Sequence, residues 1–237
     1  MVPQREPSKL LEEVAFRNNE AVFLMELGDY VSAAIILKDT IDVMQCHHDC
    51  LKGKLGDDDE DLFIDLDVPA DSICKLSMHL PSTQAVREQT PIAMFDRAFF
   101  LDQREMSAHG SMFEARQFCL IILFFNMALC LHIQAYMAHT RQDEFFAQVV
   151  TLYQMACGLH ESSSDERLIL LLQLALSNNL ACVHAHYCDM LETRRWLDEV
   201  HFICLLNAKR LNREEWTLFS TNLLANEHAQ NRSSPAA

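Results

Sequence analysis

The sequence predicts an all-α protein of stacked, antiparallel helical hairpins, and three observations lead to that prediction. The triplet Asn-x-Ala recurs within apolar stretches of helical spacing, beginning at Asn19, Asn126 and Asn179. A small or hydroxyl residue follows the alanine of the first and third triplets after twelve positions, at Ala33 and Thr193. Positions 92–234 contain no proline, the residue that most strongly interrupts helices. Small residues at matched places let successive helices pack closely, which indicates repeated hairpins.

The first predicted hairpin spans about residues 8–46. Apolar residues recur at helical spacing up to Glu26. Gly28 then permits the left-handed conformation of a turn, and Asp29 can cap the helix that follows. This region therefore predicts two helices joined by a short loop.

Two further hairpins are expected over about 111–159 and 164–208. Each opens on a capping box, at Ser111 and at Ser163, in which a hydroxyl and a carboxylate bond the free amides of a helix start. A last helix over 212–226 is expected to cap the array. Its apolar residues fall on one face, at Trp216, Phe219 and Leu223. The remaining tail, 227–237, is expected to be disordered.

Residues 51–110 lack the helical pattern and predict an irregular insertion. Within it, 62–68 alternates like a short strand, and 92–101 is either its partner or a short helix. An acidic run over 57–71 contains eight acids and no base. The run lacks the glycine and glutamate of a calcium-binding loop, so calcium binding is not expected. It is either a solvated loop or a short motif for a basic partner.

Charge and cysteine usage limit the classes of function. The formal net charge is −15 and the isoelectric point is near 5.0, which argues against binding to nucleic acid or to anionic membranes. The most apolar run, 118–133, is shorter than a membrane span and predicts a buried helix. Nine scattered cysteines favour a reducing location such as the cytoplasm, and no secretory signal is visible in the sequence.

The packing positions resemble the tetratricopeptide-like (TPR-like) helical-repeat superfamily. In the first hairpin the matching residues are Ala21, Leu24, Gly28, Asp29, Tyr30, Ala33 and Leu37. Weaker matches follow in the second (Met127, Ala128, Leu131) and third (Leu180, Ala181, Thr193, Leu197, Val200). The resemblance implies a single domain over 1–226, acting as a non-catalytic interaction module or scaffold. Its concave groove, lined by the first helix of each hairpin, would hold a peptide or helix of a partner protein.

The candidate partner groove comprises Asn19, Val22, Asn126, Leu129, His132, Asn179, Cys182 and His186. Positions that are basic in carboxylate-gripping relatives carry Ala15, Asn18, Ile122, Phe125, Ala175 and Asn178, so a carboxylate clamp is not expected. An asparagine amide offers a donor and an acceptor to a ligand backbone. The alternative is that the asparagines bond a neighbouring helix inside the core.

A metal- or cofactor-binding helical protein is the competing prediction. Cysteine and histidine gather at 46–50 and at 182–188. In the second cluster the pairs spaced four apart lie on two different helix faces, so core residues are expected there. The sequence contains no phosphate-binding loop, nucleophile elbow or HExxH motif. We therefore expect neither an enzyme nor a bound metal or cofactor.

Overall fold

The computed structural model describes residues 7–52, 74–76, 92–102, 112–137, 142–160 and 166–233. Within these ranges nearly all of the chain is helical, which confirms the all-α class. The helices are α1 (Pro7–Glu26), α2 (Tyr30–Lys52), α5 (Met112–Met137), α6 (Gln142–His160), α7 (Glu166–His186), α8 (Met190–Asn207) and α9 (Arg213–Ser233).

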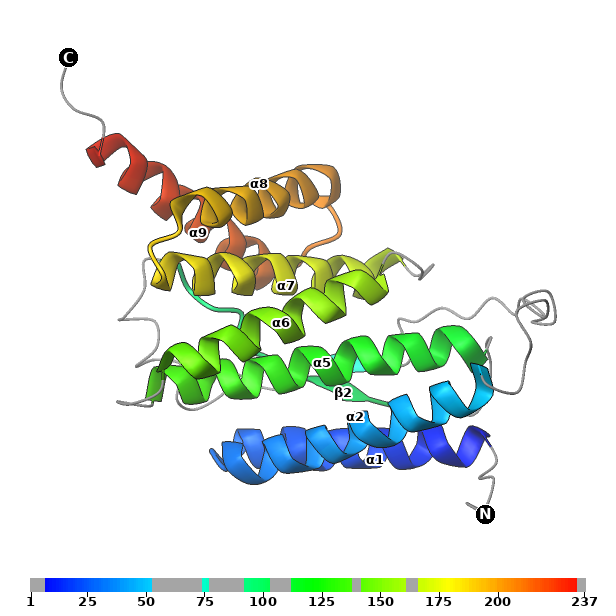
Figure 1. Cartoon of the computed structure of the whole chain (residues 1–237). Helices are drawn as coiled ribbons and strands as arrows, with labels where there is room; N and C mark the ends of the chain where they lie inside the picture. The colour runs from blue at the N-terminus through cyan, green and yellow to red at the C-terminus, as the bar shows by residue number, and fades with distance from the viewer. Residues whose placement is uncertain are drawn as a thin grey trace.

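Helices that follow one another in sequence pack as neighbours, giving the pairs α1/α2, α5/α6 and α7/α8 (Figure 1). Each pair also contacts the next, through α2 with α5 and α6 with α7, and α9 packs on α8. The array therefore advances from the N-terminus to the C-terminus in chain order.

Local signals explain several helix ends. Gly28 adopts a left-handed φ of +83° between α1 and α2, and the Asp29 carboxylate accepts the Ser32 N–H at 3.1 Å. At the start of α9, Asn212 and Glu215 form a reciprocal capping box, each side chain accepting the other's backbone N–H at 2.9 Å. The boxes expected at Ser111 and Ser163 lie outside the described residues.

Two predicted helix ends were wrong. α2 continues beyond residue 46 to Lys52, and α9 continues through 227–233, which was expected to be disordered tail. Both extensions lack glycine and proline, and α9 ends two residues before Pro235. Because nothing in either stretch breaks a helix, propagation continues at about one hydrogen bond per added residue.

The structure places a two-stranded sheet in the region expected to be irregular. Strand β1 (Cys74–Leu76) pairs antiparallel with β2 (Phe99–Leu101), with Lys75 opposite Phe100. Residues 92–101 are therefore not helical, and their last three residues, Phe99–Leu101, pair with β1. The candidate strand at 62–68 lies outside the described residues.

Helix α5 occupies the middle of the core. Its apolar run Ala115–Met137 is long enough to span a membrane by length and composition, but 89% of the most apolar window is buried inside the protein. Burial of this kind is typical of a central helix, as the sequence predicted for 118–133.

Candidate functional site

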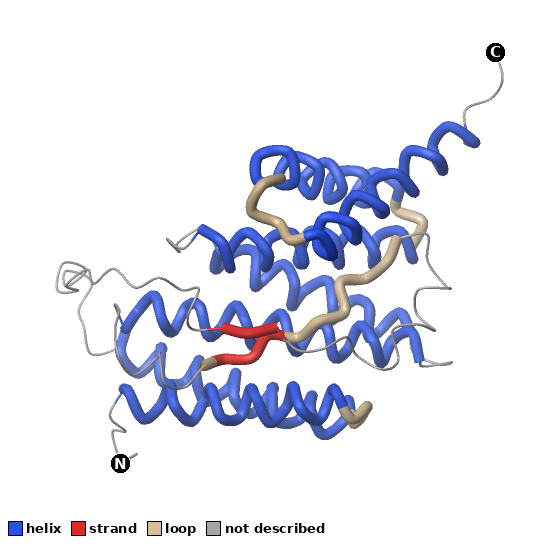
Figure 2. The backbone as a smooth tube through the Cα atoms, turned by 180° about the vertical axis from the view of Figure 1, so that it is seen from behind, coloured by secondary structure: helices blue, strands red, loops and turns tan. Residues whose placement is uncertain are grey.

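An extended stretch, Ile92–Asp102, crosses the helical array on one side. We call it the inner segment. In Figure 2 it runs across the helices as the loop and strand in front, with its N-terminal end towards α9 and its C-terminal end towards α1. The segment therefore runs opposite to the order of the helices that it crosses.

Two asparagines hold the N-terminal half of the inner segment by its backbone. Asn222 on α9 accepts the Ala93 N–H at 2.9 Å and donates to the Ala93 carbonyl at 2.7 Å. Asn179 on α7 does the same at Phe95, with distances of 2.7 and 3.1 Å. Each amide therefore satisfies both polar groups of one residue.

The C-terminal half of the inner segment is held in the same way. Asn126 on α5 accepts the Phe99 N–H at 2.9 Å and donates to the Phe99 carbonyl at 2.8 Å. Asn19 on α1 binds Leu101 with distances of 2.7 and 2.6 Å. Four helices thus supply four amides to one extended chain, an arrangement that we call the asparagine ladder.

Two more asparagines complete the ladder, and each directly precedes one already described. Asn18 donates to the Phe99 carbonyl at 2.9 Å and accepts from Asn126 at 2.9 Å. Asn178 donates to the Ala93 carbonyl at 2.9 Å and accepts from Asn222 at 2.7 Å. Each therefore links two helices through a backbone carbonyl that both asparagines bond. Asn18 links α1 to α5, and Asn178 links α7 to α9.

The ladder consists of two equivalent units related by a shift of six residues along the segment. One unit is Asn18, Asn19 and Asn126 on Phe99 and Leu101. The other is Asn178, Asn179 and Asn222 on Ala93 and Phe95. Bonded residues alternate because N–H and C=O groups on one edge of a strand recur every second residue. Arg97 has the same parity, and its side chain instead pairs with Glu214 at 2.7 Å.

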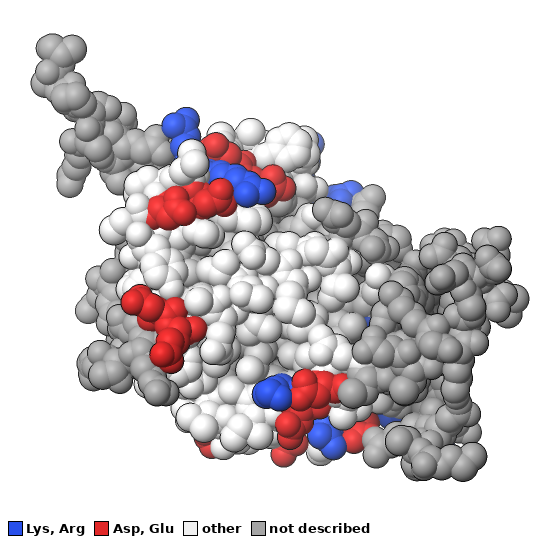
Figure 3. Space-filling model, in the orientation of Figure 1, with Lys and Arg blue, Asp and Glu red and all other residues white. Residues whose placement is uncertain are grey.

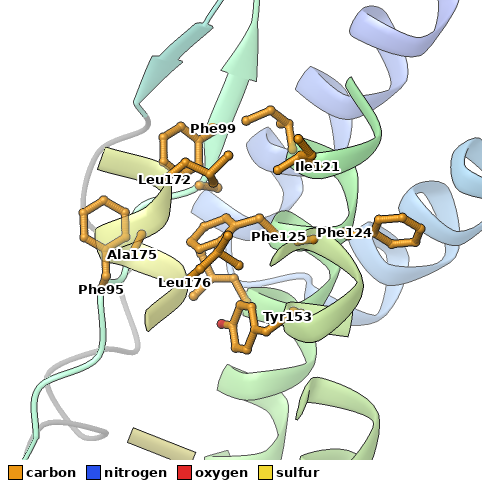
Figure 4. Close-up of a cluster of buried hydrophobic side chains, with 14 of the residues drawn as sticks. Phe95, Phe99, Ile121, Phe124, Phe125, Tyr153, Leu172, Ala175 and Leu176 are labelled. Atoms are coloured by element: carbon orange, nitrogen blue, oxygen red, sulfur yellow. The ribbon is translucent and has the colours of Figure 1, made fainter. Parts of the chain in front are cut away.

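Aromatic side chains anchor the inner segment beside the amides. The Phe95 ring stacks on Phe219 of α9 with centroids 6.1 Å apart. The Phe99 ring meets Phe125 of α5 edge-on at 5.0 Å (Figure 4). Both rings of the segment are almost completely buried. Edge-to-face and offset-stacked rings contribute beyond their buried area, so these contacts add specificity to backbone binding.

A buried tyrosine and histidine support the Asn179 rung. The Tyr153 hydroxyl accepts from Asn179 Nδ2 at 3.0 Å and lies 3.3 Å from His132 Nδ1. The tautomer of His132 decides which of the two groups donates in this contact. The other ring nitrogen, Nε2, is buried and has no hydrogen-bond partner in the described part of the chain. Burial, with a smaller effect of His186, lowers the pKa of His132 to about 3, so His132 is neutral at pH 7.

The structure brings together only part of the predicted groove. Asn19, Asn126 and Asn179 are three rungs of the ladder, but the chain that they bind is their own. Val22, Leu129, Cys182 and His132 are buried, and His186 is half-buried against the Phe146 ring at 4.2 Å. Of these five, the Cys182 thiol reaches the segment, donating to the Ile92 carbonyl at 3.4 Å. A charge at Leu129 would therefore test the core rather than the site.

Sequence reasoning missed Asn18, Asn178 and Asn222. The signal for the first two was the Asn-Asn doublet, which occurs at both 18–19 and 178–179. Asn222 lies on the predicted capping helix outside any Asn-x-Ala triplet. Its distinguishing property is that Asn222 lies one turn from Phe219 on the buried face of α9.

The competing metal prediction gains no support from the described residues. Among them, no group of three or more histidine, cysteine, aspartate or glutamate side chains is placed to hold an ion. Side chains of the 46–50 cluster lie outside the described part. Cys182 is a buried thiol, whereas Cys188 is exposed, in the turn before α8.

Comparison with known proteins returned no match. No protein-family model matches the chain, and neither a curated protein nor a solved structure matches it. The geometry of the ladder is therefore the main basis for a functional proposal.

Proposed function

We propose that this protein is a non-catalytic interaction module of TPR-like architecture. Its ladder face, the side of α1, α5, α7 and α9 that carries the six asparagines, binds an extended segment of a partner protein. One observation supports this above all: four of the six asparagines each chelate the N–H and C=O of one residue and so bind features common to every polypeptide.

The placement of the rungs agrees with the architecture that the sequence resemblance implies. Every asparagine of the ladder lies on the first helix of a hairpin or on α9, the next helix in that series. The second helices, α2, α6 and α8, contribute no rung among the described residues. A repeat array whose first helices line the binding surface has this distribution.

The test is affinity purification from the native cell with a ladder variant and a matched control. Asn19→Ala removes one rung at a half-exposed position, so the fold should survive the change. Asn207→Ala removes an asparagine on α8 whose side chain donates to the carbonyl of Ile203, one turn away on the same helix. We expect the wild type and Asn207→Ala to retain the same partner and Asn19→Ala to lose roughly tenfold of it, about 1.4 kcal/mol.

Circular dichroism must show that both variants keep the wild-type helical signal. Partner recovery that is the same for Asn19→Ala and Asn207→Ala would show that the ladder face is not the binding surface. If the wild type retains no protein in an amount close to its own, the protein is not an interaction module.

A further inference from the structure

We propose that the inner segment stands in for a partner peptide, and that the ladder face exchanges one for the other. The exchanging partner is an extended stretch with two aromatic side chains four residues apart and a basic residue midway between them. This inference rests on the proposed function and adds to it the kind of peptide that binds.

The first step is that the ladder does not distinguish its own chain from another. The four chelating amides bond the backbone atoms of the segment, at Ala93, Phe95, Phe99 and Leu101. A peptide of any sequence offers the same groups at the same spacing of about 6.8 Å for alternate residues. The asparagines therefore bind alternate residues of an extended chain without selecting its side chains.

The second step is that side-chain contacts set the preferred sequence. Phe95 and Phe99 place their rings against Phe219 and Phe125, and their own centroids are 6.1 Å apart. Between them, Arg97 pairs with Glu214, whose side chain is 75% exposed. An incoming peptide that reproduces these contacts needs aromatic, basic and aromatic residues at alternate positions. Its N-terminal end lies at α9, as it does in the inner segment, where Asn222 of α9 bonds Ala93.

The third step is that many contacts between helices do not run through the inner segment, although the segment itself is buried. Neighbouring helices pack directly along the array, including α2 on α5, α6 on α7 and α8 on α9. Between α1 and α5, and between α7 and α9, the bridging amides Asn18–Asn126 and Asn178–Asn222 also bond each other. The segment can therefore leave while these helix contacts remain, and an incoming chain finds the same face.

The experiment uses a fluorescein-labelled peptide with the sequence of Ile92–Asp102. It is titrated into the wild type and into an opened variant, Phe95→Leu with Phe99→Leu, which keeps all six asparagines. Leucine retains most of the apolar volume but loses the ring contacts, so the peptide gains an advantage over the chain's own segment. We expect the opened variant to bind at least roughly tenfold more tightly than the wild type by fluorescence anisotropy.

Two controls identify the contacts. A peptide with both phenylalanines replaced by alanine should lose roughly tenfold or more of its affinity for the opened variant. Asn19→Ala in the opened variant should weaken both peptides, because the lost rung binds backbone. Equal binding of the two peptides would overturn the aromatic requirement.

Native-state hydrogen exchange of the wild type tests the same inference without a destabilising change. We expect the Phe95 and Phe99 amides to exchange faster than amides in the middle of α5, and faster still when unlabelled peptide is added in excess. Exchange only through global unfolding, unaffected by peptide, would show a permanent strand and overturn the inference. So would an opened variant that forms dimers and excludes the peptide, since the replacing segment would come from a second copy.

The outcomes separate this inference from the proposed function. If a native partner is lost with Asn19→Ala but the peptide never exchanges, the partner binds near Asn19 without replacing the inner segment. The exchange then fails, while the protein remains an interaction module. If the peptide exchanges while no native partner is recovered, this inference is supported as chemistry and the proposed function fails.

Discussion

The two halves of the asparagine ladder contain the same three-residue unit but are supported differently. In the half on α1 and α5, the bound stretch is also strand β2, which pairs with β1. In the half on α7 and α9, Asn179 is supported from behind by Tyr153 and, through it, by His132. Backbone chelation therefore needs additional support in both halves, supplied by a strand in one and by buried side chains in the other.

The difference also concerns water. Asn19 is partly exposed where it binds Leu101, whereas Asn179 and Asn178 are completely buried. Water can replace the hydrogen bonds of a side-chain amide that is partly exposed, but it cannot replace those of a buried amide. The two halves should accordingly respond unequally to the same substitution, and the predictions below measure that inequality.

The largest expected difference is between Asn179→Ala and Asn19→Ala. Asn179→Ala leaves the Phe95 N–H and C=O without their chelating amide in a buried site, which should lower the free energy of unfolding by about 4 kcal/mol. Asn19→Ala should cost about 1 kcal/mol, because Asn19 is partly exposed and water can take the place of its side chain at Leu101. Urea denaturation measures both, and equal losses would contradict this explanation.

The next effect is a pH dependence that should come from His132, which lies on α5 and supports Asn179 of the α7/α9 half through Tyr153. His132 titrates at 6.5 when unfolded and at about 3 when folded, so the unfolded state binds the extra proton as pH falls below 6.5. Stability should therefore drop by about 2 kcal/mol between pH 6.5 and 5.0 because of His132. In His132→Phe the free energy of unfolding should no longer fall by this amount between pH 6.5 and 5.0. Urea denaturation at the two pH values measures the change.

Removal of a single hydroxyl should have a smaller effect. Tyr153→Phe keeps the ring in place against Phe125 and removes the bonds to Asn179 and His132. We expect a loss of about 1.5 kcal/mol. Tyr30→Phe is the matched control at another largely buried tyrosine, and its loss should be clearly smaller if support of the ladder explains the effect.

Double-mutant cycles should show that the bridging amides are equivalent in the two halves. The Asn18–Asn126 and Asn178–Asn222 pairs each share one amide bond and one backbone carbonyl. Alanine cycles on each pair should give coupling energies of about 1 kcal/mol that agree within experimental error. Coupling in one pair alone would show that the two units are not repeats of one design.

The smallest effect is expected at the Arg97–Glu214 pair, between the two halves. Arg97→Gln should change the free energy of unfolding by about 0.5 kcal/mol, because the carboxylate is largely exposed and the pair is screened by salt. A large loss would mean that this contact, rather than the amides, joins the halves.

The sequence was sufficient to predict the helix pairs and the Gly28 turn, because these follow from local spacing. It also singled out Asn19, Asn126 and Asn179, but as residues of a partner groove and not as ligands of the chain's own backbone. The ladder itself was not predictable from local spacing. Phe95 and Asn179 lie 84 positions apart, and the register of the inner segment depends on four helices being in place. The buried environments of Leu129 and Val22 were missed for a related reason: helical periodicity identifies a face, but the neighbouring hairpin decides whether that face stays open.

The central claim is that side-chain amides hold the backbone of alternate residues of the inner segment. The most direct measurement is amide hydrogen exchange, resolved by residue, in the wild type and in Asn126→Ala. We predict protected N–H groups at Ala93, Phe95, Phe99 and Leu101 in the wild type, and in the variant a loss of protection greatest at Phe99. Exchange at the rate of a free peptide at these four positions in the wild type, or uniform loss across the segment in the variant, would contradict the account.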